Sequence, residues 1–544
     1  MFEIEPLVFW GWVFLTLFIA VMLIFGVVGM RRVKDSDDFA TARSSYGPLI
    51  LALAMTATTA SGGTFLGLPG FAYRSGFPAL WYALFYPLGV YCGVLLCLRA
   101  VRRAGQHFGS RSIPEYLGDR FDSDALRLVA ALFSLTLLFY LAAQLLASAV
   151  MFTNMLGLPL LPALFVTAIV LMVYITLGGA HADILTDGLQ GFLMLLLAPL
   201  VLGMFLVGFG VDGGFSGMLS RLDELDPSLT KALHPTHTLF DSWWDVFALF
   251  CAHLPLGLLP HIGNKLWALK DNRQQVKFIV LSFIFGLILP TITFGGLLAR
   301  ARLGDVLLAE GRTPNEAIPE LFIATLPSWM AALIGTGVLA AVMSTADGLV
   351  VSIAQIFAND IFRRTIAPKW MQKSNARTID RAALLISRVA TVLILGGALA
   401  MAWSMQEMNV ALLIWVGVGG MMAASSGPMF LGVLWRRTTR VGSLVGFVFG
   451  GLVFSLLKLG LIQPESFSEG TLQSIVDWLA AQESNPYSCA TLGGFVSVAT
   501  TAAVSLVTEP PHEEHLDLLC GERVRSSPPP NECNDDPTQQ PCAD

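Results

Sequence analysis

Long apolar segments follow one another along almost the whole chain, each near the roughly 20 residues that a helix needs to cross a bilayer. About thirteen such segments lie near residues 8–30, 48–72, 77–99, 125–153, 158–178, 186–210, 242–265, 278–300, 328–358, 382–403, 408–434, 441–462 and 487–508. This pattern predicts an all-α polytopic membrane protein with about 13 transmembrane helices. The first segment is too long for a cleaved signal peptide, so we expect it to remain as a helix.

Two of these segments are interrupted by residues that do not favour a continuous membrane helix. The first break combines hydroxyl side chains and glycine over residues 54–64 and is followed by Pro69 and Gly70. The second break contains two prolines and two histidines over residues 252–263. Backbone that leaves a helix inside a bilayer exposes polar groups that protein, water or a ligand must satisfy. Two breaks at corresponding places, five spans apart, predict a transport site.

Composition agrees with a membrane protein and narrows its function. The 544 residues are 55% hydrophobic and 13% charged, with a mean hydropathy of +0.67, which is more apolar surface than one soluble core buries. The net charge of −6 indicates no nucleic-acid partner. The sequence contains no glycine-rich phosphate loop and no His-Glu-x-x-His motif, so neither ATP-driven pumping nor an enzyme activity is expected.

Lysine and arginine gather in alternate loops, and such loops face the cytoplasm in membrane proteins. The basic loops contain Arg31, Arg32 and Lys34; Arg102, Arg103 and Arg111; Lys265, Lys270, Arg273 and Lys277; Arg363, Arg364, Lys369 and Lys373; and Arg436, Arg437 and Arg440. An odd number of spans then predicts an N-terminus outside the cell and a C-terminus in the cytoplasm. The short loop expected at 178–186 carries neither lysine nor arginine.

The ninth segment contains a group of oxygen-bearing side chains. Ser344, Thr345 and Asp347 fall within one helical turn, and Ser344 and Asp347 share a face. Two hydroxyls and a carbonyl released from Ala341 are the hard oxygen donors that an alkali cation accepts. Alternatively, the hydroxyls only bond the carbonyl one turn back. Asp347 favours a functional site, because ionisable side chains at membrane depth are rare.

A second polar group begins the sixth segment. Asp183 and Asp187 lie four residues apart, and Gln190 follows three residues later, so a polar stripe is expected to enter the membrane from the cytoplasmic side. Acids in a first helical turn suit the helix dipole, which is the role expected for Asp183. Asp187 lies one turn deeper beside Thr186 and is a candidate for handling a cation.

Four short motifs resemble those of the sodium/solute symporter family, and the resemblance covers residues 8–508. The motifs are Leu66-Gly-Leu-Pro-Gly70; Gly178 and Gly179 followed by Thr186, Asp187 and Gln190; Leu259-Pro-His-Ile262; and Ala340-Ala-Val-Met-Ser-Thr-Ala-Asp347. Pantothenate/monocarboxylate-type and proline-type members look most similar. The resemblance implies a LeuT-like fold of two inverted five-helix repeats, at 48–210 and 242–434, with broken first and sixth core helices.

The resemblance also implies the organisation of the remaining chain. It assigns an extra transmembrane helix and a cytoplasmic loop to residues 1–47, an extracellular loop to 211–241, and two further transmembrane helices to 435–508. Residues 509–544 are rich in proline, acidic residues and serine. Such a composition cannot bury enough apolar surface to order itself, so a disordered cytoplasmic tail is expected.

The family's sodium ligands can be carried over by position. The main sodium site would use the carbonyls of Ala57, Ala60 and Ala341 and the hydroxyls of Ser344 and Thr345. The resemblance leaves open a second cation site with Asp187, Ser344 and Asp347. Sodium is therefore the expected coupling ion, and no organic cofactor is expected.

The resemblance likewise implies residues that contact the transported solute. They are Thr58, Thr59, Ser61, Gly62, Thr64, Trp81, Phe85, Tyr140, Gln144, Ala252, His253 and Leu256. Proline-specific members carry aromatic residues where this chain has Ala252 and Leu256, and an acid where it has Thr59, which disfavours proline. His253 is open to two interpretations: it contacts a substrate carboxylate, or it donates a hydrogen bond to a carbonyl freed by the break.

These features together predict a secondary active transporter in the cell membrane, and the lipid bilayer and a small solute are its expected partners. The function expected is sodium-coupled symport of a small organic solute, a carboxylate such as pantothenate or a short monocarboxylate, by alternating access. An amino-acid or sugar symporter and a proton-coupled carrier of the same fold remain alternatives. A channel would need a filter loop and a sensor an output domain, and neither is visible.

Overall fold

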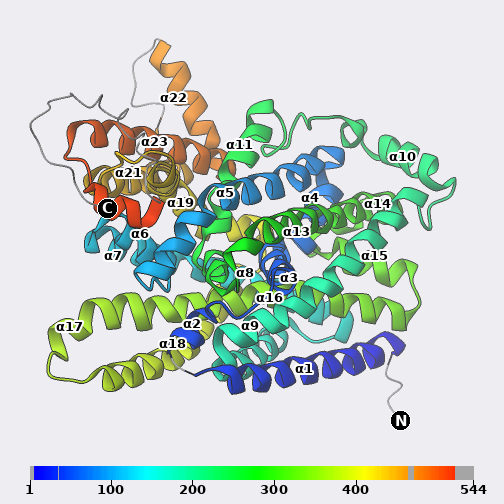
Figure 1. Cartoon of the computed structure of the whole chain (residues 1–544). Helices are drawn as coiled ribbons and strands as arrows, with labels where there is room; N and C mark the ends of the chain where they lie inside the picture. Colours follow the sequence, from blue (N-terminus) through cyan, green and yellow to red (C-terminus); the bar gives the residue numbers. More distant parts are fainter. Residues whose placement is uncertain (1–4, 35, 464–470, 521–544) are drawn as a thin grey trace, which may run out of the picture.

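The computed structural model describes residues 5–34, 36–463 and 471–520, and across these ranges the chain is helical without a β-strand (Figure 1). This confirms the predicted all-α class. Short turns of 3₁₀- or π-helix, labelled η, interrupt several of the α-helices. The breaks in the helices lie deep in the molecule, and they position the candidate site.

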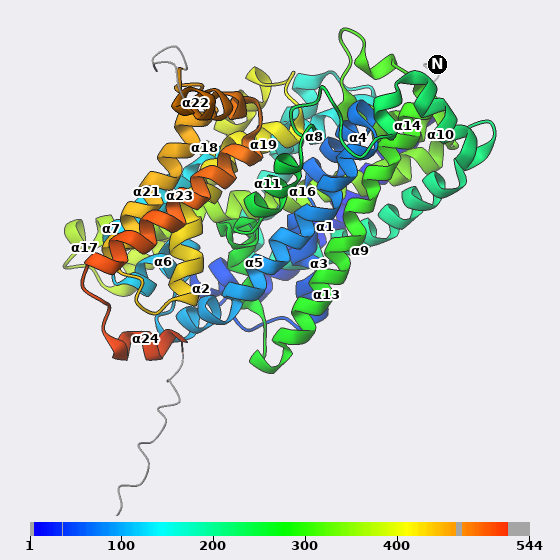
Figure 2. The same ribbon diagram turned by 90° about the horizontal axis from the view of Figure 1, so that it is seen from above.

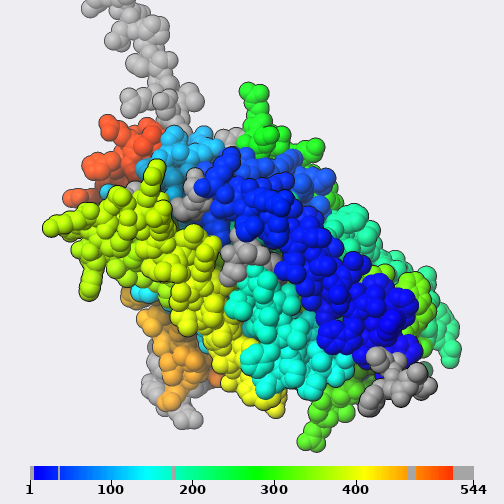
Figure 3. All heavy atoms as spheres, turned by 90° about the horizontal axis from the view of Figure 1, so that it is seen from below, coloured from blue at the N-terminus to red at the C-terminus, as the bar shows by residue number. Residues whose placement is uncertain are grey.

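The first half of the chain builds six apolar spans. Its elements are α1 (Pro6–Arg32), α2 (Ser36–Thr41), α3 (Pro48–Thr59), η1 (Gly63–Gly67), α4 (Leu68–Ser75), η2 (Phe77–Ala79), α5 (Leu80–His107), α6 (Ile113–Phe121), α7 (Asp124–Phe133), η3 (Ser134–Thr136), α8 (Leu137–Leu156) and α9 (Leu160–Val207). The segment that follows contains α10 (Gly214–Leu225) and η4 (Pro227–Thr230). Helix α1 packs along α9 and α16, and the space-filling view shows α1 beside the first part of α9 (Figure 3).

The second half of the chain continues the pattern of broken and continuous helices. Its core elements are α11 (Trp243–His253), η5 (Leu256–Leu258), α12 (Pro260–Gly263), η6 (Asn264–Ala268), η7 (Asn272–Gln274), α13 (Gln275–Ile288), η8 (Leu289–Thr293), α14 (Phe294–Leu303), η9 (Val306–Leu308), η10 (Pro314–Glu316), α15 (Ala317–Thr325), α16 (Ser328–Gln355), η11 (Ile356–Ile366), α17 (Ala367–Trp370), α18 (Ala376–Ser404), α19 (Val410–Ser426), η12 (Gly427–Leu431) and α20 (Gly432–Leu434). Helices α21 (Arg440–Lys458) and α23 (Pro486–Val507) follow and run side by side, with α22 (Thr471–Ala481) and η14 (Gln482–Ser484) between them in the chain (Figure 2).

The predicted spans agree with these helices. Among the described residues, ten helices are long and apolar enough to cross a membrane without a sharp bend, and Leu160–Val173 is a shorter apolar helix. Two further spans are bent pairs: Pro48–Thr59 with Gly63–Ser75, at 59°, and Trp243–Leu258 with Pro260–Ala268, at 53°. The bends occur at both breaks that the sequence predicts.

Helix α9 differs from the prediction of a loop at 178–186. Only Gly179 leaves helical geometry (φ 52°, ψ −142°), and it separates two spans that are otherwise continuous. A Cβ atom at this position would lie 2.5 Å from the backbone oxygen of Phe39, so both the positive φ and the space require glycine. Asp183 therefore lies in the first turns after the kink and Asp187 one turn deeper, as the spacing predicted.

The segment after the last span differs from the expected disordered tail of 509–544. Residues Glu513–Cys520 form α24, which packs against α5 at one end of the molecule (Figure 2). His515 Nε2 lies 2.7 Å from the carbonyl oxygen of Asp119, and Asp517 accepts a 2.5 Å contact from Arg436. Leu516 is buried in this contact, which supplies the apolar burial that composition alone did not predict. Residues 521–544 lie outside the described residues.

Candidate functional site

The end of α3 meets the middle of α16 through oxygen atoms. Helix α3 ends at Thr59, so carbonyls of its last turn are left without an N–H partner within the helix. The Ser344 hydroxyl lies 2.9 Å from the carbonyl oxygen of Ala57 and 2.8 Å from that of Ala341. The structure thus brings together three of the five predicted sodium ligands, and all three residues are completely buried.

The other two predicted ligands lie beside this group. Thr345 donates its hydroxyl hydrogen to the carbonyl of Thr58 at 2.9 Å, one residue further along α3 than Ala57. Ala60 follows the helix end with φ −87° and ψ 77°, so its carbonyl turns away from the helical direction. The predicted alternative also holds in part, since Ser344 bonds the carbonyl of Ala341 within its own helix.

This cluster has the chemistry that a small, hard cation requires. Its donors are hydroxyl and carbonyl oxygens, which suit alkali and alkaline-earth ions better than soft metals. Each hydroxyl can turn its hydrogen outward and offer a lone pair, so a cation could bind between α3 and α16 without new side chains. The residues present therefore fit a sodium ion.

Asp187 lies next to this cluster but has other partners. Its carboxylate accepts a hydrogen bond from the Thr58 hydroxyl at 2.6 Å and contacts the ammonium of Lys265. Lys265 Nζ also lies 2.7 Å from Asp183 Oδ2. All three charged side chains are more than nine-tenths buried. Asp347 is buried on α16, in the same region as Ser344.

In the structure, residues of the predicted second cation site are therefore engaged in contacts within the protein. A lysine ammonium contacts Asp187, while Ser344 bonds the carbonyls of Ala57 and Ala341. Sequence analysis counted Lys265 among the charges of a cytoplasmic loop, which is wrong, because the residue is buried in η6. Its position five residues after Pro260, at the end of an apolar break, was the available signal.

A small pocket adjoins the unwound part of the first broken span. It has a volume of about 30 Å³ and is lined by Thr59, Ser61, Gly63, Thr64, Leu68, Tyr82, Tyr86, Tyr140, His253, Leu256, Ala411, Ile414 and Trp415. None of these described lining residues is a lysine, an arginine or an acid. Hydroxyl groups and aromatic rings therefore dominate the surface that a ligand would meet.

The pocket includes only part of the predicted substrate set. Thr59, Ser61, Thr64, Tyr140, His253 and Leu256 line it. Thr58 bonds Asp187 instead, and Gly62 donates its backbone N–H to Gln144 Oε1 at 2.9 Å behind the pocket. Ala252 is buried beside a different cavity, between α11, α19 and α23.

Trp81 and Phe85 lie apart from the pocket. The indole of Trp81 donates to the carbonyl of Ala232 at 2.8 Å and lines an apolar groove on the outer side of α5. The next residues on the same helix, Tyr82 and Tyr86, face the pocket instead. Sequence reasoning missed these two tyrosines, and it also missed Trp415 on α19, which donates to the Tyr82 hydroxyl at 3.2 Å.

His253 occupies a cage of aromatic rings at the second break. The ring centroids of Tyr82, Tyr86, Trp415 and Tyr487 lie between 4.9 and 5.8 Å from its own. Its Nδ1 lies 2.5 Å from the carbonyl oxygen of Leu249, which can only accept, so Nδ1 is assigned the hydrogen. This hydrogen bond goes to a carbonyl one turn earlier in α11, before the break. In the neutral ring, Nε2 is then an acceptor.

Two spans that break at an oxygen cluster and a polar pocket define a class of protein, the secondary transporters whose sites lie at discontinuous helices. The family follows from the sequence comparison. The model of the Sodium:solute symporter family matches residues 39–450, most of the chain, and the protein belongs to that family. The resemblance proposed from the four motifs is confirmed.

Curated relatives within this family differ in what they transport. The chain is 26% identical over 466 residues to a sodium/pantothenate symporter of Escherichia coli, with 83% of this chain and 91% of that protein covered. It is 25% identical over 446 residues to a high-affinity proline transporter of Bacillus subtilis, with 79% and 88% covered. These similarities support sodium-coupled solute transport as the activity of the family.

Solved structures with the same fold support the architecture. A sodium-coupled sialic acid symporter superposes with a TM-score of 0.70 at 20% identity, over 92% of this chain and 98% of that one. A nucleobase-cation-symport-1 family transporter gives a TM-score of 0.52 at 14% identity, over 88% and 97%. The predicted LeuT-like fold, with broken first and sixth core helices, is confirmed.

Proposed function

We propose that this protein is a sodium-coupled symporter of a small organic carboxylate that also carries a hydroxyl or amide N–H donor. The observation that carries the proposal is the joining of Ser344 to the carbonyls of Ala57 and Ala341, directly beside the pocket at the broken helix. A sodium ion bound there would hold α3 against α16. Each ligand then favours the same conformation, so their affinities rise together.

The lining of the pocket supports the solute class. Hydroxyls of Ser61, Thr64 and Tyr140 are donors for a carboxylate, and the half-helix made by η1 and α4 begins at Gly63 on the pocket, with the partial positive charge of its N-terminus. His253 Nε2 is an acceptor in the neutral ring, which favours a second group on the solute that donates a hydrogen. Pantothenate and short hydroxy-monocarboxylates both have these two groups.

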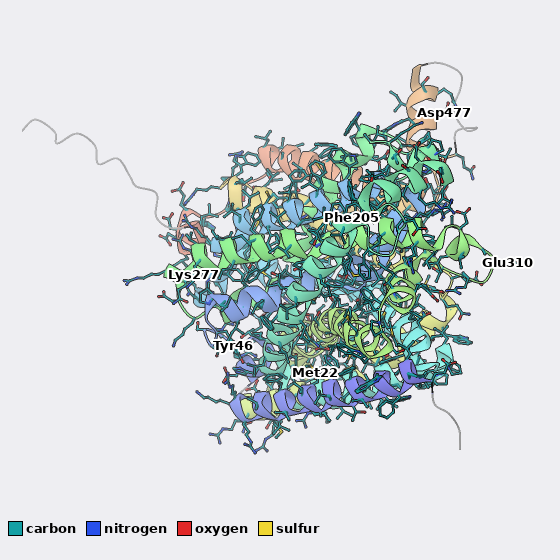
Figure 4. All side chains as sticks on the ribbon, turned by 90° about the vertical axis from the view of Figure 1, so that its right-hand side faces the viewer. Met22, Tyr46, Phe205, Lys277, Glu310 and Asp477 are labelled. Carbon is teal, nitrogen blue, oxygen red and sulfur yellow. The ribbon has the colours of Figure 1, made fainter. Side chains whose placement is uncertain are left out.

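The charges at the two ends of the molecule support an orientation in the membrane. Lys277 and Tyr46 lie at one end, and Glu310 and Asp477 lie at the other (Figure 4). The first end also carries ion pairs of Arg43 with Asp37 and of Arg364 with Glu115. The positive-inside rule assigns this end to the cytoplasm, which leaves the N-terminus outside.

Uptake into proteoliposomes tests the proposal. The purified protein would be reconstituted and given an inward sodium gradient with labelled pantothenate, lactate, propionate, proline or glucose, with a potassium gradient as the control. Accumulation of pantothenate or lactate that requires sodium is expected, and propionate, which lacks the hydroxyl, should be weaker. Accumulation that follows a proton gradient and ignores sodium would refute sodium coupling, and preference for proline or glucose would refute the solute class.

A further inference from the structure

Lys265 is held firmly at the second break of the chain. It belongs to η6, and the carbonyls of Leu266 in η6 and of Leu269 just after it accept hydrogen bonds of 2.7 and 3.0 Å from the buried guanidinium of Arg102. The adjacent Trp267 donates its indole N–H to the carbonyl of Val101 at 2.9 Å. Helix α5 therefore fixes the backbone that directly follows Lys265, and the ammonium reaches Asp183 and Asp187 from this fixed segment.

The two carboxylates form a place where a cation is required. Asp183 and Asp187 lie one turn apart on α9 and are buried, and a buried charge without a partner is strongly destabilising. The ammonium of Lys265 bonds both of them. An ammonium is a compact, single positive charge with three donors, so it can take the position that a monovalent ion would hold between two carboxylates.

One side chain connects this position to the proposed sodium site. The Thr58 hydroxyl donates to Asp187 Oδ2, and the Thr58 carbonyl accepts the hydroxyl hydrogen of Thr345. Asp187, which the lysine contacts, and Thr345 of the α3–α16 oxygen cluster therefore bond two groups of the same residue of α3. A cation beside Asp187 and a cation at Ser344 would belong to one continuous region.

We propose that Lys265 is a fixed cation that takes the place of a second coupling ion, so that one sodium ion accompanies each solute molecule. The inference rests on the proposed function, since it concerns the number of ions in that cycle. The ammonium neutralises part of the charge on Asp183 and Asp187 and repels a second free cation from this position. The oxygen cluster at Ser344 then remains as the place for a mobile ion.

The test compares four forms of the reconstituted full-length chain: wild type, Lys265→Met, Lys265→Arg and Lys270→Met. Lys270 is exposed five residues further along the chain and serves as the matched control. Radioactive sodium binding to protein in detergent gives the number of sites, and the sodium dependence of uptake gives the Hill coefficient. Wild type, Lys265→Arg and Lys270→Met should bind one sodium with a Hill coefficient close to one, while Lys265→Met should bind two with a coefficient above one.

The double variant Lys265→Met/Asp183→Asn protects the test against a folding defect. It keeps the net charge of the cluster and leaves Asp187 free to bind sodium, so it should also show two sites. Two sodium ions bound by the wild type would overturn the inference. So would one sodium ion bound by folded Lys265→Met and by the folded double variant. Absence of sodium-driven uptake by the wild type is a separate result, because it would refute the proposed function whatever the number of binding sites.

Discussion

The two broken helices use different chemistry at equivalent places in the chain. The break after α3 contains small hydroxyl residues and glycines, and it offers neutral carbonyl and hydroxyl oxygens to α16. The break after α11 contains two prolines and large apolar residues, and it presents the side chains of His253 and Lys265. The first break therefore suits an ion that binds reversibly, whereas the second supplies polar and charged side chains of the protein itself.

Packing explains why each break has its own composition. A Cβ at Gly62 would lie 2.7 Å from that of Ala147, so the first break is pressed closely against α8. At the second break, Cβ atoms at Gly89 and Gly93 of α5 would lie 2.6 and 1.8 Å from backbone oxygens of α11 and its end. There the partner helix supplies the glycines, which leaves the break itself free to carry bulky side chains.

The largest effect is expected from removing the neutral oxygens of the first site. Replacing both Ser344 and Thr345 by Ala should raise the sodium concentration for half-maximal uptake by roughly 100-fold, since each hydroxyl on an ion contributes about 1.5 kcal/mol or more. Sodium titrations of uptake measure this. Thr336→Ala on the same helix is the control, because its hydroxyl only bonds the carbonyl of Ala332. An unchanged sodium dependence of the double variant would refute the assignment of these two hydroxyls as sodium ligands.

A substitution at the second break should weaken solute binding and leave the sodium dependence of uptake nearly unchanged. His253→Phe loses the acceptor at Nε2, so the KM for a hydroxyl-bearing solute should rise about 10-fold, while the sodium dependence stays within about two-fold. Saturation curves for solute and for sodium separate the two effects. His253→Gln should recover part of the affinity, and Trp81→Phe should change nothing. Equal losses for propionate and lactate would contradict the proposed contact.

Removing the hydrogen bond that connects the two breaks should have a moderate effect on sodium binding. Thr58→Val removes the hydrogen bond to Asp187 and keeps the carbonyl that Thr345 contacts. Because Lys265 still neutralises Asp187, we expect a loss of about 1 kcal/mol, or roughly five-fold weaker sodium binding. Direct sodium binding in detergent measures it, with Thr391→Val on α18 as the control. A loss as large as that of the Ser344 and Thr345 double variant would mean that the Thr58 hydroxyl itself binds the ion.

The smallest effect on transport is expected far from both breaks. Truncation after Val507 removes α24 and the buried side chain of Leu516. The free energy of unfolding should therefore fall by about 2 kcal/mol, while uptake stays within about two-fold. Thermal unfolding in detergent measures the change, and Leu516→Ala in the full chain should reproduce most of it. A truncated protein with full stability would show that α24 does not contribute through this contact.

Sequence patterns predicted much of the oxygen cluster between α3 and α16 because helical spacing is a local property. Ser344 and Thr345 are consecutive residues in an apolar span, and the break at residues 54–64 announced free carbonyls. The prediction of Trp81 and Phe85 in the pocket failed by one position. One residue turns a helix by about 100°, so the identity of the inward face depends on how α5 packs and not on its composition.

The sequence by itself determined the all-helical class, the positions of the two breaks and the family. Lipid imposes these features directly, because a hydrocarbon interior demands long apolar helices and makes every interruption costly. Only the tertiary structure decided that Lys265 lies between Asp183 and Asp187, and that α24 packs against α5. These contacts join residues far apart in the chain, and their free energy depends on burial and distance, which no local pattern of residues contains.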